Sequence, residues 1–201
     1  MAKRVLLFCC KGFETLEFAP FVDVFGWASD SFGCDVEIIT GGYTKTDVST
    51  FGIPVTVDKT LDEISADDYD AVAVPGGFEE FGFYDEAYDD RFLELIRCFD
   101  QQRKCIASIC VAALALGKSG ILNGRKATTY HLGDGRRQRQ LSEFGAVVIP
   151  DQSIVIDNNV ITSFCPETGP YVAIELLRKL AGEEIANTVG HAMGYDKETP
   201  V

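Results

Sequence analysis

The sequence has few histidines and few basic residues, and each shortage excludes a class of function. Only two of the 201 residues are histidine, and neither is accompanied by cysteine or by paired acids, so we expect no metal site. Lysine and arginine number 18 against 31 aspartates and glutamates, which gives a net charge of −13. Because this charge repels nucleic-acid phosphates and anionic lipids, we expect neither as a partner.

The sequence also lacks a Cys-x-x-Cys pair and any long hydrophobic run. Its seven cysteines are odd in number and form no such pair, which disfavours a disulfide framework and a zinc cluster and favours a reducing compartment. The first apolar run, residues 5–10, is too short for a signal peptide or a membrane span. We therefore expect the protein in the cytoplasm.

The overall composition is typical of a folded globular domain. Hydrophobic residues make up 46% of the chain and charged residues 24%, and 201 residues suit one core, so we predict a single domain over residues 1–201. Short buried-type strands are predicted at 5–10, 36–40, 71–74, 105–109, 147–149, 154–156 and 160–162, with a hairpin or loop around 43–68.

Helical periodicity separates these strands. Helices are predicted at about 14–31, 89–101, 111–116, 136–144 and 169–181. Alternating strands and helices in a chain of this size predict an α/β fold, a flavodoxin-like or doubly wound three-layer sandwich with a mostly parallel sheet. In such sheets ligands bind beyond the carboxyl ends of the strands, so the residues that follow each strand are the candidates for chemistry.

Cys110 is the strongest of these candidates. It lies between a predicted strand and a helix, and Ser108 and Ala112 provide small residues two positions to either side, which is the spacing of a nucleophile elbow. The N–H groups at a helix start favour a thiolate. A buried structural cysteine fits the same pattern, and the spacing alone leaves both interpretations open.

Two carboxylates follow the first strand. We expect Glu17 to face the crevice and Glu14 to face water. A carboxyl group beside a thiolate keeps its proton, because two anions do not readily share one site, and a neutral Glu17 would donate hydrogen bonds and carry protons. The alternative is that both acids merely complement the dipole of the helix.

Other residues near the strand ends carry weaker signals. Gly77, in a Pro-Gly-Gly segment, offers backbone N–H groups for an oxyanion hole. His131 is a candidate base, and His191 is expected at the surface. The aromatic residues that follow Gly77 could roof a pocket or seal a dimer, but we favour core packing for them: Phe78, Phe81, Phe83 and Tyr84.

Four segments occur in an order that resembles the ThiJ/PfpI superfamily, over roughly residues 4–182: 11–17, 71–77, 107–110 and 126–129. The resemblance implies a flavodoxin-like, class I glutamine amidotransferase-like sandwich, usually a homodimer, with Cys110 as the nucleophile and Glu17 as a protonated acid beside it. It also implies that the N–H groups of Gly77 and Val111 form an oxyanion hole.

The sequence departs from that pattern at two places. Peptidase-like members have histidine directly after the cysteine, where this chain has Val111. Members of the deglycase-like branch often have histidine directly after two threonines, where this chain has Tyr130, with His131 one position later. Whether His131 or Tyr130 takes part in the chemistry stays open.

The leading hypothesis is a cofactor-independent enzyme that acts on small reactive dicarbonyls or their protein adducts, as a glyoxalase III or deglycase does. Cys110 would form a hemithioacetal with the carbonyl substrate and Glu17 would shuttle protons. The alternatives are an oxidative-stress sensor or chaperone-like protein with an oxidisable Cys110, in which Cys165 could act as a resolving thiol, and last an intracellular peptidase or amidase.

Overall fold

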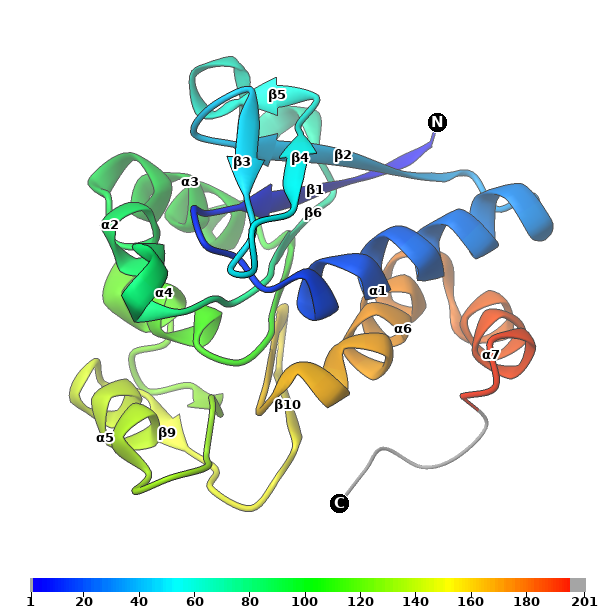
Figure 1. Ribbon diagram of the computed structural model, residues 1–201. Helices are drawn as coiled ribbons and strands as arrows, with labels where there is room; N and C mark the ends of the chain where they lie inside the picture. Colours follow the sequence, from blue (N-terminus) through cyan, green and yellow to red (C-terminus); the bar gives the residue numbers. More distant parts are fainter. Residues whose placement is uncertain (1, 196–201) are drawn as a thin grey trace.

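A computed structural model describes residues 2–195, so the remaining residues of the expected domain, 1 and 196–201, lie outside the described part. A seven-stranded sheet in the order β10-β11-β7-β6-β1-β2-β5 forms its centre (Figure 1). All neighbours pair in parallel except β10 and β11. The strands are β1 (Lys3–Cys9), β2 (Val36–Gly42), β5 (Lys59–Thr60), β6 (Ala71–Val74), β7 (Cys105–Ser108), β10 (Ile154–Asp157) and β11 (Val160–Ser163).

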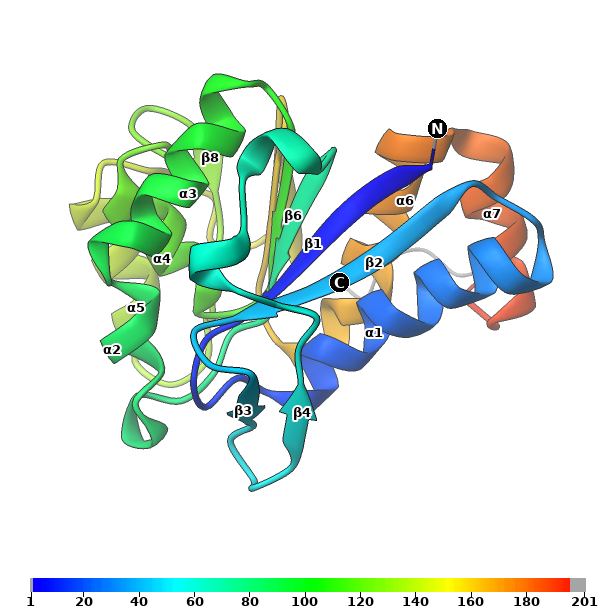
Figure 2. The same cartoon turned by 90° about the horizontal axis from the view of Figure 1, so that it is seen from above.

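Helices cover both faces of this sheet. Figure 2 shows α1 (Thr15–Gly26), α6 (Gly169–Ala181) and α7 (Glu183–Ala192) on one side, and α2 (Phe83–Ala87), α3 (Asp90–Gln101), α4 (Ala112–Ser119) and α5 (Arg136–Glu143) on the other. A π-helical segment, η1 (Trp27–Ser31), extends α1. Short 3-10 helices are η2 (Leu61–Glu63), η3 (Ala66–Asp68), η4 (Glu79–Phe81) and η5 (Pro166–Thr168). The predicted flavodoxin-like sandwich is confirmed.

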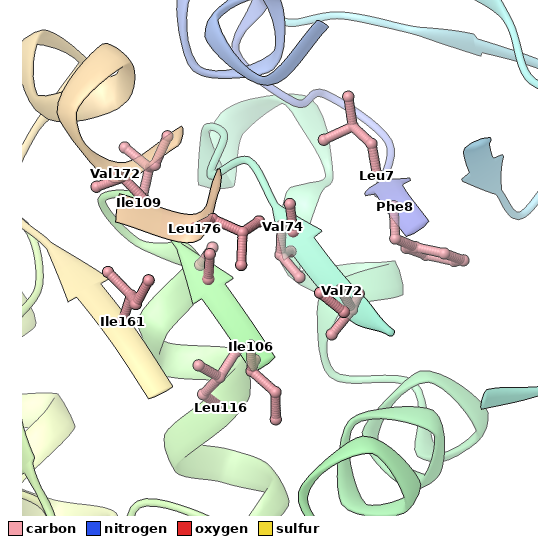
Figure 3. Close-up of a cluster of buried hydrophobic side chains, with 14 of the residues drawn as sticks. Leu7, Phe8, Val72, Val74, Ile106, Ile109, Leu116, Ile161, Val172 and Leu176 are labelled. Carbon is pink, nitrogen blue, oxygen red and sulfur yellow. The ribbon is translucent and has the colours of Figure 1, made fainter. Parts of the chain in front are cut away.

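The first strand shows why the apolar runs form this sheet. Residues 5–9 of β1 are fully buried, because β2 and β6 flank the strand and helices cover both of its faces. In Figure 3, Val172 and Leu176 of α6 lie on one side of β7, and Leu116 of α4 lies on the other. Burying such side chains contributes roughly 1.5–3 kcal/mol each.

Two further pairs of strands lie outside the main sheet. The excursion predicted around residues 43–68 contains the hairpin of β3 (Thr46–Val48) and β4 (Pro54–Thr56). The short strands β8 (Lys126–Ala127) and β9 (Val147–Val148) pair in parallel beside α5. The predicted hairpin near 154–162 is present as β10 and β11.

The structure adds elements that the sequence did not indicate. Helix α7 contains His191, which is exposed as expected, although its segment could not be assigned from the sequence. The short helix α2 follows Gly82, whose φ of +81° suits glycine. The cluster of aromatic residues that we expected to pack in the core divides, since Phe83 is fully buried whereas Phe78 and Phe81 are 39% and 47% exposed. The prediction is therefore wrong for Phe78 and Phe81.

Helices α1 and α6 approach each other closely where α6 begins. A Cβ added to Gly169 would lie 2.9 Å from Cγ of Pro20 in α1. A glycine at this position therefore allows the two helices to pack at their observed separation. The contact holds the first half of α1 against the sandwich.

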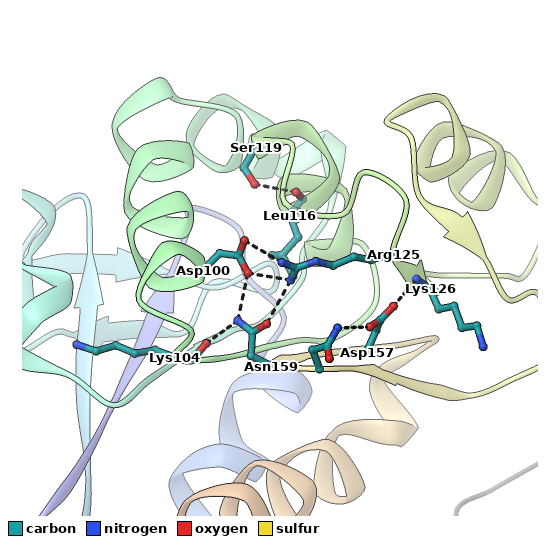
Figure 4. Close-up of polar contacts among 9 residues, drawn as sticks. Asp100, Lys104, Leu116, Ser119, Arg125, Lys126, Asp157 and Asn159 are labelled. Atoms are coloured by element: carbon teal, nitrogen blue, oxygen red, sulfur yellow. Dashed lines mark hydrogen bonds and ion pairs between the residues drawn. The ribbon is translucent and has the colours of Figure 1, made fainter.

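At the amino end of the sheet, before β7 and β11, a polar cluster joins three segments (Figure 4). The guanidinium of Arg125 donates to both carboxylate oxygens of Asp100, at 2.8 and 3.0 Å, and to the side-chain oxygen of Asn159 at 3.2 Å. The Asn159 amide donates in turn to Asp100 and to the carbonyl of Lys104. This cluster anchors α3 to the β10–β11 hairpin.

Candidate functional site

A pocket opens at the carboxyl end of the sheet, where the predicted strand ends converge. Its volume is about 390 Å³. Residues that follow β1, β6, β7 and β11 all line it, as expected for an open parallel sheet. The lining residues are Glu14, Gly77, Phe78, Glu79, Glu80, Cys110, Val111, Tyr130, Leu132, Arg137, Cys165, Pro166 and Glu167.

Cys110 lies on a sharp turn between β7 and α4. Its φ is +56°, a left-handed conformation that costs a side-chain-bearing residue roughly 1–2 kcal/mol. Hydrogen bonds hold both of its peptide groups, since the Cys110 N–H donates to the Ser163 carbonyl at 3.1 Å and the Thr129 hydroxyl donates to the Cys110 carbonyl at 2.8 Å. The turn aims the thiol at the pocket, of whose lining it forms part, with 7% of the residue exposed.

The first turn of α1 places Glu17 in the interior behind this pocket. Glu17 is fully buried, and its Oε2 accepts a hydrogen bond from the Gly76 N–H at 2.6 Å. Its Oε1 is buried and has no hydrogen-bond partner among the described residues. Burial raises the pKa of Glu17 to about 8, so its carboxyl group is protonated at pH 7. The sequence analysis expected a neutral Glu17 because of a neighbouring thiolate, whereas burial is the main cause here.

The thiol of Cys110 is neutral too, which differs from the sequence expectation. Burial raises the pKa of Cys110 well above its ordinary value, and the nearby Glu17 acts in the same direction. The Val111 N–H lowers it, as the helix start predicts, but burial outweighs that effect. The sequence could show the helix start but not the depth at which the thiol lies.

The Pro-Gly-Gly segment after β6 lies against Glu17 and against the two residues that flank Cys110, Ile109 and Val111. A Cβ on Gly76 would lie 2.9 Å from Glu17 Oε2, and one on Gly77 would lie 2.3 Å from the Gly12 carbonyl oxygen. Glycines are therefore required for this close approach. Within the described chain, no oxygen accepts a hydrogen bond from the N–H of Gly77 or Val111, the two groups expected to hold an oxyanion.

Glu14 corrects another expectation. Instead of facing water it is half-buried and lines the pocket, and burial raises its pKa. Its backbone N–H donates to the Gly76 carbonyl at 2.8 Å, which fixes the start of α1 against the strand end. Phe78, which also lines the pocket, has the roofing role that we considered less favoured than core packing.

His131 lies against Cys165 and not in the lining beside Cys110. Its Nδ1 is 3.5 Å from the Cys165 sulfur, and its ring stacks on Phe164 with the centroids 4.0 Å apart. Burial raises the pKa of the Cys165 thiol to about 11. The structure thus brings Cys110 and Cys165 to one pocket and assigns the imidazole to the second thiol, while Tyr130 lines the pocket itself.

The sequence analysis missed Arg137 of α5. Its guanidinium reaches the pocket, donates to Glu79 Oε2 at 2.7 Å and lies 5.0 Å from the centre of the Tyr84 ring. The residue is separated from Cys110 by the β8 segment, so local spacing gave no signal for it. Among residues 2–195, no group of three or more histidine, cysteine or acidic side chains could hold a metal ion, and no helix is long and apolar enough to cross a membrane.

A cysteine in a left-handed turn between a parallel strand and a helix defines an α/β protein of the nucleophile-elbow class. Residues 3–179 match the DJ-1/PfpI family, and the chain belongs to that family. Protein DJ-1alpha of Drosophila melanogaster is 30% identical over 194 residues, covering 96% of this chain and 84% of that protein.

Two further relatives agree with this assignment. General stress protein 18 of Bacillus subtilis is 28% identical over 171 residues, covering 85% of this chain and 93% of that protein. The crystal structure of Drosophila melanogaster DJ-1beta is similar with a TM-score of 0.84 at 26% identity, covering 96% of this chain and 98% of that one. The resemblance to the ThiJ/PfpI superfamily drawn from four short segments is confirmed.

Proposed function

We propose that this protein is a cofactor-independent cysteine enzyme that converts small reactive dicarbonyls, or their protein adducts, to 2-hydroxy acids. One observation carries the proposal: a fully buried, protonated Glu17 lies beside a strained Cys110 that opens into a pocket. A buried carboxyl group that keeps its proton at pH 7 is suited to proton transfer, and a thiol in the same site is suited to covalent catalysis.

The first step forms a covalent bond between enzyme and substrate. The Cys110 sulfur attacks the aldehyde carbon of methylglyoxal, the carbonyl π bond breaks, and the thiol proton ends on the aldehyde oxygen, giving a hemithioacetal. The N–H groups of Gly77 and Val111, which donate to no oxygen among the described residues, stabilise the negative charge that develops on that oxygen. Because the thiol is neutral at rest, its proton is transferred during the attack rather than before it.

Glu17 then moves hydrogen from the aldehyde carbon to its neighbour. It donates its proton to the ketone oxygen while it takes the proton of the aldehyde carbon, which gives an enediol. It next protonates the second carbon and takes the hydroxyl proton of the first, which gives a lactoyl thioester. Water cleaves the carbon–sulfur bond, releasing lactate and restoring the thiol, so methylglyoxal and water are consumed in equal amounts.

Lactate formation from methylglyoxal tests this function. Cys110→Ser should lower turnover by about 10³-fold or more, because the nucleophile is lost. Cys98→Ser is the matched control, since Cys98 is half-buried in α3 outside the pocket lining, and it should leave turnover unchanged. Unchanged turnover in Cys110→Ser would falsify the proposal.

An oxidative-stress sensor is the second candidate, favoured by the similarity to General stress protein 18 and by two thiols in one pocket. Mild peroxide would add about 32 Da at Cys110 for a sulfinate, or remove about 2 Da for a disulfide between Cys110 and Cys165. The raised pKa of Cys110 ranks this role second, because peroxide reacts with thiolate. A peptidase ranks last, because Val111 follows the cysteine and His131 contacts Cys165.

We also propose that the protein is a homodimer in the cytoplasm. Exposed apolar side chains lie near the start of α1, on the β3–β4 hairpin and beside the pocket, with Phe51 in contact with Phe78 and Phe81: Leu16, Phe51, Ile53, Phe78 and Phe81. A second copy is the occupant that the family resemblance suggests for this surface. All seven cysteines are free thiols, which suits a reducing compartment. Light scattering would measure the mass in solution.

A further inference from the structure

The pocket beside Cys110 contains more acids than its chemistry requires. Four carboxylic side chains from three separate segments line it, against one basic side chain, Arg137. The acids come from the start of α1, from the segment after β6 and from η5: Glu14, Glu79, Glu80 and Glu167. We call these four residues the carboxylate rim.

Two guanidinium groups neutralise only one member of the carboxylate rim, Glu79. Arg137 donates to Glu79 at 2.7 Å, and Arg136 lies 3.3 Å from the same carboxylate. In the described chain, Glu14, Glu80 and Glu167 form no ion pair with lysine or arginine. A net negative charge therefore surrounds the way to the thiol.

A second observation shows what kind of group the inner end of the pocket accepts. Behind the pocket, the carboxyl group of Glu17 is fully buried, and its Oε1 atom has no hydrogen-bond partner among the described residues. At the pocket lining, no oxygen of the described residues accepts a hydrogen bond from the N–H of Gly77 or Val111, which suits an uncharged carbonyl oxygen in the inner part. The site thus combines an inner part for a carbonyl with an anionic entrance.

We infer that the carboxylate rim makes the Cys110 pocket select carbonyl compounds that carry a positive charge over those that carry a negative charge. This inference rests on the proposed function for its reaction. The pocket should accept neutral dicarbonyls less readily than cationic carbonyl compounds and more readily than anionic ones.

The size of the effect follows from Coulomb's law. One unit charge about 6 Å from another changes a local concentration about threefold in water, and a lower effective dielectric increases the factor. Removing one carboxylate lowers the local concentration of a cation and raises that of an anion. We therefore expect about a three- to tenfold change in the ratio of their rates for each carboxylate removed.

Charged thiol reagents measure this selectivity without requiring turnover. Methanethiosulfonates that carry a trimethylammonium or a sulfonate group are compared on the full chain in a Cys165→Ser background, with the rate determined on the Cys110 peptide by mass spectrometry. Each rate is divided by the rate at which the same reagent modifies a small uncharged thiol in solution. The thiolate fraction of Cys110 is the same for both reagents, so it cancels from the ratio.

We expect the normalised rate of the cationic reagent to exceed that of the anionic reagent by more than about 10-fold. This ratio should fall three- to tenfold in Glu167→Gln and further when Glu80→Gln is added. It should also fall in 1 M salt, which screens the charges. Glu184→Gln is the matched control with the same change in charge. It lies on α7, which packs near η1 at the end of α1 opposite Glu14, and it should not change the ratio.

A ratio near 1, or a ratio unchanged by Glu167→Gln, overturns the inference. Methylglyoxal turnover in the same preparations separates the two proposals. Charge selectivity without turnover leaves the inference standing and refutes the enzyme. Turnover of methylglyoxal together with a reagent ratio near 1 refutes the inference and leaves the enzyme standing.

Discussion

The two ends of the central sheet differ in how far their polar groups are satisfied by hydrogen bonds. At the amino end, Arg125, Asp100 and Asn159 satisfy one another through directed hydrogen bonds. At the carboxyl end, Glu17 keeps a buried oxygen without a partner and Cys110 adopts a left-handed conformation. An unsatisfied buried group and a strained residue both reduce stability, and their presence at the carboxyl end supports our proposal that the chemistry takes place there.

The largest expected effect concerns the proton carrier at the carboxyl end. Glu17→Gln keeps the shape of the side chain and its hydrogen bond with Gly76 but cannot transfer a proton in the same way, so methylglyoxal turnover should fall by about 10²–10⁴-fold. Steady-state kinetics measure this effect, with Glu184→Gln as the control for the same substitution at an exposed position. Turnover within twofold of the wild type would remove Glu17 from the mechanism.

The same residue should make stability depend on pH. The folded protein keeps the Glu17 proton up to about pH 8, whereas the unfolded chain releases it near its ordinary pKa of 4.5. The folded state therefore binds more protons between these values, and the free energy of unfolding decreases as pH rises through this window, on the order of 4 kcal/mol in all.

Urea denaturation at pH 5, 6.5 and 8 checks this dependence. The stability of the wild type relative to Glu17→Gln should be highest at pH 5 and lowest at pH 8, since the variant carries no ionisable group at this position. A difference that stays constant across the three pH values contradicts a buried protonated acid at this end of the sheet.

At the amino end the expectation reverses, because there the polar groups stabilise the fold. Arg125→Ala leaves the partly buried Asp100 without its bidentate partner and should destabilise the protein by about 2 kcal/mol, with unchanged turnover. Arg103→Ala is the control, an exposed arginine in the same region that should cost less than about 0.5 kcal/mol. Equal losses in the two variants would show that the cluster contributes nothing specific.

The smallest effect measures the strain at Cys110. Because φ there is +56°, Cys110→Gly should be more stable than Cys110→Ala by about 1 kcal/mol. At exposed Asp23, in the middle of α1, the order should be opposite, with alanine better by about 1 kcal/mol. Thermal denaturation of the four variants compares the two positions, and alanine as the better residue at both would exclude backbone strain at the elbow.

Local patterns in the sequence were sufficient for the sheet and for part of the site. The apolar runs predicted β1, β6 and β7 because strands buried on both faces leave no polar alternation, and the small residues around Cys110 predicted the turn. Glu17 was chosen over Glu14 because it enters the first helix within one turn of Pro20.

The remaining features depend on contacts between distant segments. The raised pKa of Cys110 results from burial by several elements, which no spacing encodes. The contact of His131 with Cys165 and the arrival of Arg137 at the pocket depend on how the segments after α4 return to the sheet. Helix α7 packs on α6 and η1, partners that its own sequence does not identify.

The close approach of Gly169 to Pro20 has a consequence for evolution and for engineering. Glu17 is three residues before Pro20 in the same helix, and only 2.6 Å separates its carboxylate from the Gly76 nitrogen. A methyl group added at residue 169, at the start of α6, would push against Pro20 of α1. The shift of α1 would displace the Glu17 carboxyl group, although the substitution is in a different helix. If Glu17 is the proton donor that we propose, residue 169 should tolerate little variation, and a survey of mutational tolerance would test this.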